Sequence, residues 1–172
     1  NLVSIAFFIA LGLVLPMIFH SFNMGGKIFL PMHIPVLLGG LILGPLAGLI
    51  IGILTPILSS VITGMHPVFP MLPLMIVELG TYGLLSGYLS SKYLSKNKDM
   101  TIFQSLIISM IVGRLMGGVM AFILGYFGFS EGPVTFLINA ITTGLPGIII
   151  QLIFIPIIAK RTEKFYENRL NS

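Results

Sequence analysis

The sequence predicts an all-α integral membrane protein, a bundle of six transmembrane helices of which the second is short. Hydrophobic residues make up 56% of the 172 residues and charged residues only 8%, whereas soluble domains carry about 25% charged residues. Apolar stretches of about 20 residues recur along the chain, and each could cross a hydrocarbon core about 30 Å thick. The mean hydropathy of +1.07 agrees with this class. From the length we expect one domain, residues 1–172.

The first three apolar segments are separated by glycine and proline. The first extends from about Leu2 to Phe19. The second, from about His33 to Leu43, is shorter than the ~17 residues that a perpendicular span needs. Residues 28–32 could complete it, or it could be partly embedded. Gly44-Pro45 marks a tight break, and the third segment then extends from about Leu46 to Thr63.

Three longer segments follow a loop, residues 64–70, that two prolines make rigid. They run from about Met71 to Leu89 or beyond, from Ile102 to Phe127, and from Val134 to Ala159. A polar stretch with three lysines separates the fourth from the fifth, and a charged amphipathic tail, residues 160–172, follows the sixth. Six spans place both ends of the chain on one side of the membrane.

The distribution of lysine and arginine predicts which side that is. Cations are concentrated between the fourth and fifth segments and after the sixth, at Lys92, Lys96, Lys98, Lys160, Arg161, Lys164 and Arg169. The loops on the opposite side hold only Lys27. Because cytoplasmic loops carry the excess of basic residues, we expect cytoplasmic termini and outward-facing loops at 20–32, 64–70 and 128–133.

Two ionisable residues, Glu78 and Arg114, lie inside apolar segments. Counting at 1.5 Å per residue places Glu78 roughly 10 Å and Arg114 roughly 15–20 Å below the outer surface. A charge at the bilayer centre costs at least ~2.5 kcal/mol, so such residues usually face a cavity or a partner. We expect them to line one substrate site, and a purely structural ion pair between the two helices is the alternative.

Further polar and aromatic residues are expected near the same depth or at the outer face. Asn139 and Thr143 share a helix face at a spacing of four residues. Their alternative role is hydrogen bonding between helices, worth about 0.6 kcal/mol each. His33 and His66 flank the outer face, where each could contact a ligand or cap a helix, and Tyr82 could supply an aromatic ring.

No motif for catalysis is present in the sequence. It lacks a phosphate-binding loop, HExxH and a recognisable nucleophile motif. It has no cysteine, and its three histidines are not spaced as metal ligands. We therefore expect neither an enzyme nor a metal site, and no cofactor.

Three runs of residues resemble the substrate-binding S component of energy-coupling factor (ECF) transporters. The stretch Pro35-Val-Leu-Leu-Gly-Gly-Leu-Ile-Leu-Gly-Pro-Leu-Ala-Gly48 is similar to the family's PxLLxGxxxGPxxG pattern. Ala6-Phe-Phe-Ile-Ala10 matches its AxxxA motif, and residues 70–83 resemble its fourth helix, where a glutamate often approaches the ligand. The resemblance covers about residues 2–160.

The resemblance implies a bacterial plasma-membrane protein that binds a vitamin at its outer face and imports it with partners. The implied partners are one transmembrane coupling subunit, on which Ala6 and Ala10 dock, and two ATPase subunits. A site with one anion and one cation suits a small, polar, neutral or zwitterionic ligand, such as vitamin B6 or hydroxymethylpyrimidine. Pantothenate also fits if Arg114 takes its carboxylate.

A small proton-coupled secondary transporter is the main alternative. Glu78 would then be the proton carrier. Such proteins often contain internal repeats, and we find no convincing repeat in this sequence. An intramembrane enzyme or structural subunit is a further alternative, but no acid–base pair or nucleophile favours the enzyme.

Overall fold

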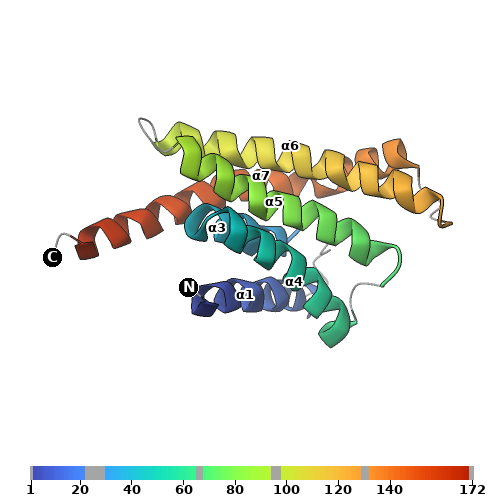
Figure 1. The fold of residues 1–172 in the computed structure, drawn as a ribbon, viewed down its shortest axis with the longest axis horizontal. Coiled ribbons are helices and arrows are strands. Elements are labelled where there is room, and N and C mark those ends of the chain that lie inside the picture. Colours follow the sequence, from blue (N-terminus) through green and yellow to red (C-terminus); the bar gives the residue numbers. More distant parts are fainter. Residues whose placement is uncertain (1, 22–29, 65–67, 94–97, 129–131, 171–172) are drawn as a thin grey trace.

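A computed structural model describes residues 2–21, 30–64, 68–93, 98–128 and 132–170 of the chain, and all secondary structure in these ranges is helical (Figure 1). The helices are α1 (Leu2–Ser21), α3 (His33–Leu43), α4 (Pro45–Thr63), α5 (Met71–Tyr93), α6 (Lys98–Gly125) and α7 (Pro133–Leu170). Five of them are long and apolar enough to cross a membrane, while α3 has only 11 residues. The all-α prediction of six helices with a short second one is confirmed.

The predicted segments and the helices differ mainly where a helix continues into polar sequence. α7 is one helix of 38 residues that runs on to Leu170, beyond the predicted end at Ala159. Residues 160–170 contain neither glycine nor proline, so nothing in the local sequence ends the helix where the apolar segment ends. For the same reason α6 begins at Lys98, before the predicted start at Ile102.

A single residue, Gly44, separates α3 from α4. Its φ of 95° lies in a region that only glycine adopts readily. Pro45 then opens α4, where its fixed φ suits the helix and its missing N–H would have had no helical partner. The Gly-Pro break predicted from the sequence thus turns the chain without an intervening loop.

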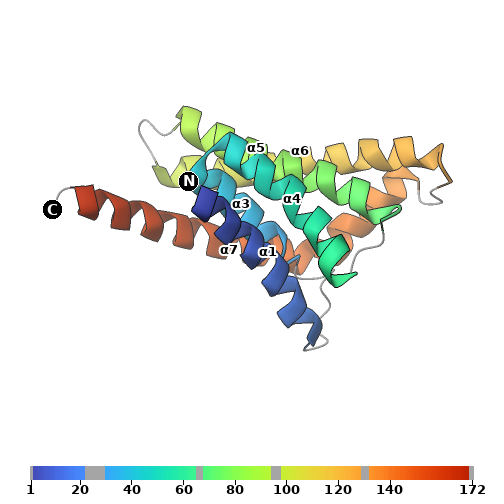
Figure 2. The same ribbon diagram turned by 60° about the horizontal axis from the view of Figure 1, so that its bottom comes forward.

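α5 lies at the centre of the bundle, where α3, α4 and α6 pack around it (Figures 1 and 2). Glycines set how closely α4 and α5 approach. A Cβ atom on Gly48 would collide with the backbone carbonyl of Gly83, and one on Gly83 would collide with the carbonyl of Gly48. Such backbone contact between small residues is a principal way in which membrane helices associate.

α3 is enclosed on nearly all sides despite its length. Residues 35–40 are all buried, and the hydroxyl of Ser86 on α5 donates a 3.3 Å hydrogen bond to the Leu37 carbonyl. By contrast, α1 and α7 lie at the periphery and expose many large apolar side chains, among them Phe7, Ile149 and Phe154. Exposing such surfaces to the hydrocarbon core of a membrane costs little free energy, because lipid tails are as apolar as the side chains.

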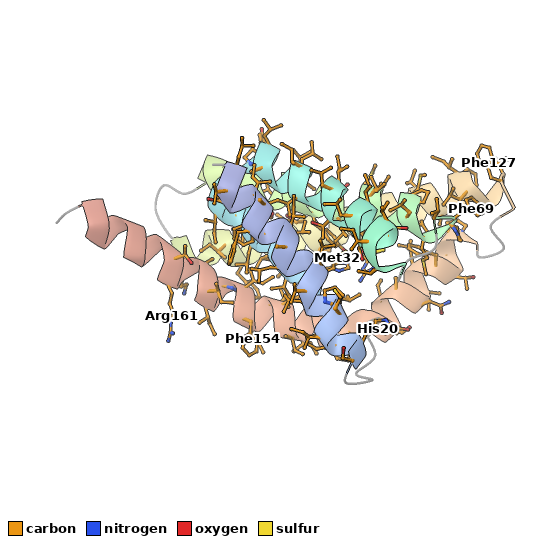
Figure 3. All side chains as sticks on the ribbon, turned by 90° about the horizontal axis from the view of Figure 1, so that it is seen from below. His20, Met32, Phe69, Phe127, Phe154 and Arg161 are labelled. Carbon is orange, nitrogen blue, oxygen red and sulfur yellow. The ribbon has the colours of Figure 1, made fainter. Side chains whose placement is uncertain are left out.

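The two ends of the bundle differ in chemistry. Figure 3 shows Phe69 and Phe127 at one end, beside two of the loops predicted to face outward, and Arg161 toward the other end. The N- and C-terminal ends of the chain lie on the same half of the ribbon in both views (Figures 1 and 2). This arrangement is compatible with the predicted topology, in which Arg161 and both termini share one side.

Candidate substrate-binding site

A cluster of polar side chains is centred on Glu78, in the first half of the central helix α5. Three groups from three helices meet its Oε1 atom. Nη1 of Arg114, on α6, lies 2.6 Å from Glu78 Oε1. The hydroxyl of Tyr82, on α5, donates a 2.7 Å hydrogen bond to the same oxygen. Nε2 of His33, on α3, lies 3.4 Å from it. The cluster therefore ties together α3, α5 and α6 through one carboxylate oxygen.

Local sequence explains how these side chains meet. Tyr82 lies four residues after Glu78, so the two share one face of α5. Gly113 on α6 leaves room for the Tyr82 ring, which a Cβ atom at that position would strike. Gly117, one turn further along α6, would place a Cβ atom 3.4 Å from Glu78 Oε2. The small residues on α6 thus let it approach closely enough for Arg114 to reach the carboxylate.

The cluster is almost completely shielded from solvent. His33 and Glu78 are each 6% exposed and Tyr82 is 1% exposed, and the Arg114 side chain is 11% exposed. Charges in such an environment are tolerated when they are paired and hydrogen-bonded. Glu78 and Arg114 meet that requirement together, and either one alone would be costly.

Three buried polar atoms in this region have no hydrogen-bond partner among the described residues. They are His33 Nδ1, Arg114 Nε and Gln151 Oε1. Most buried side-chain polar atoms in folded proteins do have a partner. Two of the three belong to side chains that contact Glu78. These side chains can therefore form further hydrogen bonds beside the carboxylate.

Leu30 connects this cluster to α7. Its carbonyl accepts hydrogen bonds from the His33 backbone N–H at 3.1 Å and from Gln151 Nε2 at 3.3 Å. Its φ of 48° is positive, which is uncommon for a residue other than glycine. A Cβ atom on Gly144 of α7 would lie 2.9 Å from the Leu30 side chain and 3.3 Å from Arg114 Nη2. Leu30 therefore lies beside Arg114, against α7.

The remaining predicted site residues have no hydrogen bond or ion pair to the Glu78 cluster among the described residues. Asn139 and Thr143 lie on α7 and are exposed, and neither forms a hydrogen bond or ion pair with the Glu78 cluster in the described part of the chain. Both share a side of α7 with Phe136, three and seven residues earlier, whose ring lies beside Gly117. His66 lies outside the described residues. Ala6 and Ala10 are exposed on α1.

Comparison with protein families identifies the chain. The family model described as "ECF transporter, substrate-specific component" matches residues 1–159 of the 172. The chain belongs to this family. Comparison with curated proteins gave no match, and comparison with solved structures gave none. The family resemblance predicted from the Pro35–Gly48 and Ala6–Ala10 motifs is confirmed, while the vitamin subgroup stays a prediction.

Membership fixes the general role of this ECF component. It is a multi-pass membrane protein that provides the substrate-specific part of a transporter. Such proteins bind a small-molecule substrate and act with ECF partners in the membrane. A substrate-binding transport component is not a class of enzyme.

Some residues around the cluster were not predicted to belong to it. Leu30 does not stand out because it lies in the predicted 20–32 loop, and Gln151 is a polar residue of the sixth segment whose position does not tie it to Glu78. The spacing of four between Glu78 and Tyr82 could have indicated their hydrogen bond, since such residues are neighbours on a helix. The contact between His33 and Glu78 joins residues 45 positions apart, and no local pattern carries that information.

Proposed function

We propose that this ECF component binds a small water-soluble vitamin or vitamin precursor, of the vitamin B6, hydroxymethylpyrimidine or pantothenate class, and imports it. The observation that carries this proposal is the Glu78 cluster, a buried group of polar side chains from three helices of a transport protein. Two of its members, His33 and Arg114, have buried polar atoms without a hydrogen-bond partner among the described residues. A substrate that hydrogen-bonds these atoms would gain affinity and orientation from groups already held in place.

The substrate site in this proposal comprises Glu78, Arg114, His33 and Tyr82. Asn139 and Thr143 extend it along the side of α7 that carries Phe136. His66, from the loop predicted to face outward, is included on the sequence alone. Ligand sites in membrane bundles are commonly built from side chains on facing helices, and intramembrane charges usually mark such sites.

Import requires energy, and we propose that it comes from partner subunits. One transmembrane coupling subunit and two ATPase subunits would complete an ATP-driven importer in the bacterial plasma membrane. Ala6 and Ala10 are exposed on the peripheral helix α1, and small residues four apart allow a second helix to approach closely. The termini would face the cytoplasm, as the lysines and arginines predict.

The direct test has two parts. Mass spectrometry of the protein purified in mild detergent should detect a retained vitamin of the proposed class. Liposomes that contain the chain with its coupling and ATPase subunits should then take up that vitamin only when ATP is supplied to the ATPases. A variant of the ATPases that cannot hydrolyse ATP is the matched control and should abolish uptake.

The same liposomes separate this proposal from the proton-coupled alternative. A secondary transporter would import the vitamin without any partner when a proton gradient is imposed, and Glu78→Gln would abolish the dependence on that gradient. The 2.6 Å contact between Glu78 and Arg114 favours the ATP-driven proposal, because a carboxylate paired with a permanent cation is poorly suited to carry protons.

A further inference from the structure

We infer that the substrate bound by the Glu78 cluster is electrically neutral and carries a hydrogen-bond acceptor and a donor close together. Anionic vitamins are therefore excluded as high-affinity substrates. The inference rests on the proposed function, because it assumes that the cluster is the substrate site. It narrows the proposed class toward hydroxylated or amide-bearing neutral molecules and away from free carboxylates and phosphates.

The first argument is charge balance. Glu78 and Arg114 carry opposite charges at a separation of 2.6 Å and cancel each other. His33 and Tyr82 add no permanent charge. An anion placed among these groups would leave a net negative charge in an environment that is more than four-fifths shielded from solvent. An uncompensated buried charge is costly in a protein and more so within a membrane, whereas a neutral ligand adds no such cost.

The second argument concerns the atoms that lack partners. An ionised carboxylate only accepts hydrogen bonds, so the His33 Nε2 atom that faces Glu78 Oε1 carries the proton. In the neutral ring Nδ1 is then an acceptor, and it is one of the buried atoms without a partner in the described part of the chain. Arg114 Nε is another, and it can only donate. A complementary substrate therefore offers a donor to His33 and an acceptor to Arg114.

The third argument concerns how the Arg114 guanidinium is already engaged. Nη1 contacts Glu78 at 2.6 Å. Nη2 faces Gly144, where an added Cβ atom would lie 3.3 Å away, and the Leu30 side chain lies at the same position. Arginine holds a carboxylate most strongly through two parallel N–H bonds. To be held in this way a carboxylate would need Nη2, on the side of α7, or would have to displace Glu78 from Nη1, while a single acceptor needs only Nε.

Matched pairs of ligands that differ in charge test this inference. We would measure binding to the purified full-length chain in nanodiscs by isothermal titration, using pyridoxine against 4-pyridoxate and pantothenol against pantothenate. Hydroxymethylpyrimidine would be a further neutral probe. We expect pyridoxine or pantothenol to bind, and to bind at least tenfold more tightly than its anionic partner.

The outcomes are distinguishable. Binding of pantothenate as tight as that of pantothenol or tighter, or of 4-pyridoxate as tight as that of pyridoxine or tighter, would overturn the neutral-substrate inference and leave the vitamin-binding proposal standing. Absence of binding by all five probes would refute the proposed substrate class and this inference with it. Because the panel uses the unaltered protein, neither result depends on whether a variant folds.

A variant adds a second measurement. Glu78→Gln leaves Arg114 as an uncompensated cation, so we expect the preference for the neutral member of the pair to fall by at least tenfold. Thr81→Ser is the matched control on α5, because the Thr81 hydroxyl donates a hydrogen bond to the Val77 carbonyl of its own helix and serine keeps that hydroxyl. An unchanged preference in folded Glu78→Gln would show that the charge balance does not set selectivity.

Discussion

Arg114 on α6 lies 2.6 Å from the Glu78 carboxylate on α5, although position counting along the two segments places Arg114 several ångströms deeper. The guanidinium stands on a long flexible chain, which can extend along the helix to reach a partner at another depth. Gly113 and Gly117 flank Arg114 on α6 and remove the side chains that would keep α6 away from α5. The pairing thus depends on glycines as much as on the two charges.

Disrupting one partner of this pair should affect stability and binding differently from removing both. Glu78→Ala leaves a buried cation and should lower the free energy of unfolding by about 3–5 kcal/mol. The combination of Glu78→Gln with Arg114→Met removes both charges and should recover most of that loss, as measured by thermal denaturation in detergent. If the cluster binds substrate, the double variant folds but fails to bind the vitamin that co-purifies with the protein in isothermal titration. Unaltered affinity in the double variant would mean that the pair is purely structural.

Tyr82→Phe isolates a single hydrogen bond of the cluster. The ring that packs against Gly113 is retained, while the 2.7 Å hydrogen bond to Glu78 Oε1 is lost. A hydrogen bond to a charged group contributes about 1.5–3 kcal/mol, so thermal denaturation should show a loss of about that size, smaller than for Glu78→Ala. Tyr126→Phe, at an exposed position just after α6, is the control and should change stability less. Equal losses in the two variants would argue against a special role for the Tyr82 hydroxyl.

The sequence was sufficient to predict the helices because their signals are local. Apolar segments ended by Gly-Pro or by polar runs predicted the bounds of α3, from His33 to Leu43, as the structure has them. The end of α7 could not be predicted in this way, because the apolar segment ends at Ala159 while the backbone of the following residues continues the helix. The hydrophobicity of a segment predicts which residues lie in the membrane, but it does not predict where helical hydrogen bonding ends.

The candidate site could be predicted only in part. Glu78 and Arg114 were identifiable because charges in apolar segments are rare. The contacts of His33 with Glu78, and of Gln151 with the Leu30 carbonyl, join residues 45 and 121 positions apart. They follow from the way α3 and α7 pack, which single-sequence periodicity does not encode. The exposure of Asn139, likewise, depends on how α7 is rotated against α6.

The glycine contact between α4 and α5 predicts a sharp difference between two glycines of the same helix. Gly83→Ala would drive a Cβ atom into the Gly48 carbonyl, and forcing a methyl group into a packed interface typically costs about 1–3 kcal/mol. At Gly80 an added Cβ atom would meet only Ile53 and Leu49 side-chain atoms, at 3.5 Å. Gly80→Ala should therefore be neutral or stabilising by up to about 1 kcal/mol, because alanine favours the helix. Thermal denaturation of both variants would test this, and similar losses would contradict the close approach of the two backbones.

Topology provides an independent prediction. All loop and tail cations other than Lys27 fall on one predicted side, so the positive-inside rule places the C-terminus in the cytoplasm. A green fluorescent protein fused after Ser172 should fluoresce in cells, whereas alkaline phosphatase fused at the same position should be inactive. A phosphatase fusion within the 64–70 loop is the matched control and should be active. The reverse pattern would place the termini outside.

The exposed face of α1 predicts a separation of binding from transport. Ala6→Trp and Ala10→Trp place a large ring where the proposed coupling subunit would pack, so uptake into liposomes with the full importer should be lost. Substrate binding by the isolated chain should remain within about twofold, because both alanines are exposed on a peripheral helix and large side chains there face lipid at little cost.

Phe7→Trp is the matched control, since Phe7 is exposed on the same helix and already carries a large ring; uptake by this variant should be retained. If binding fell in parallel with uptake in the alanine variants, Ala6 and Ala10 would be supporting the fold of this subunit, and the docking surface would have to lie elsewhere.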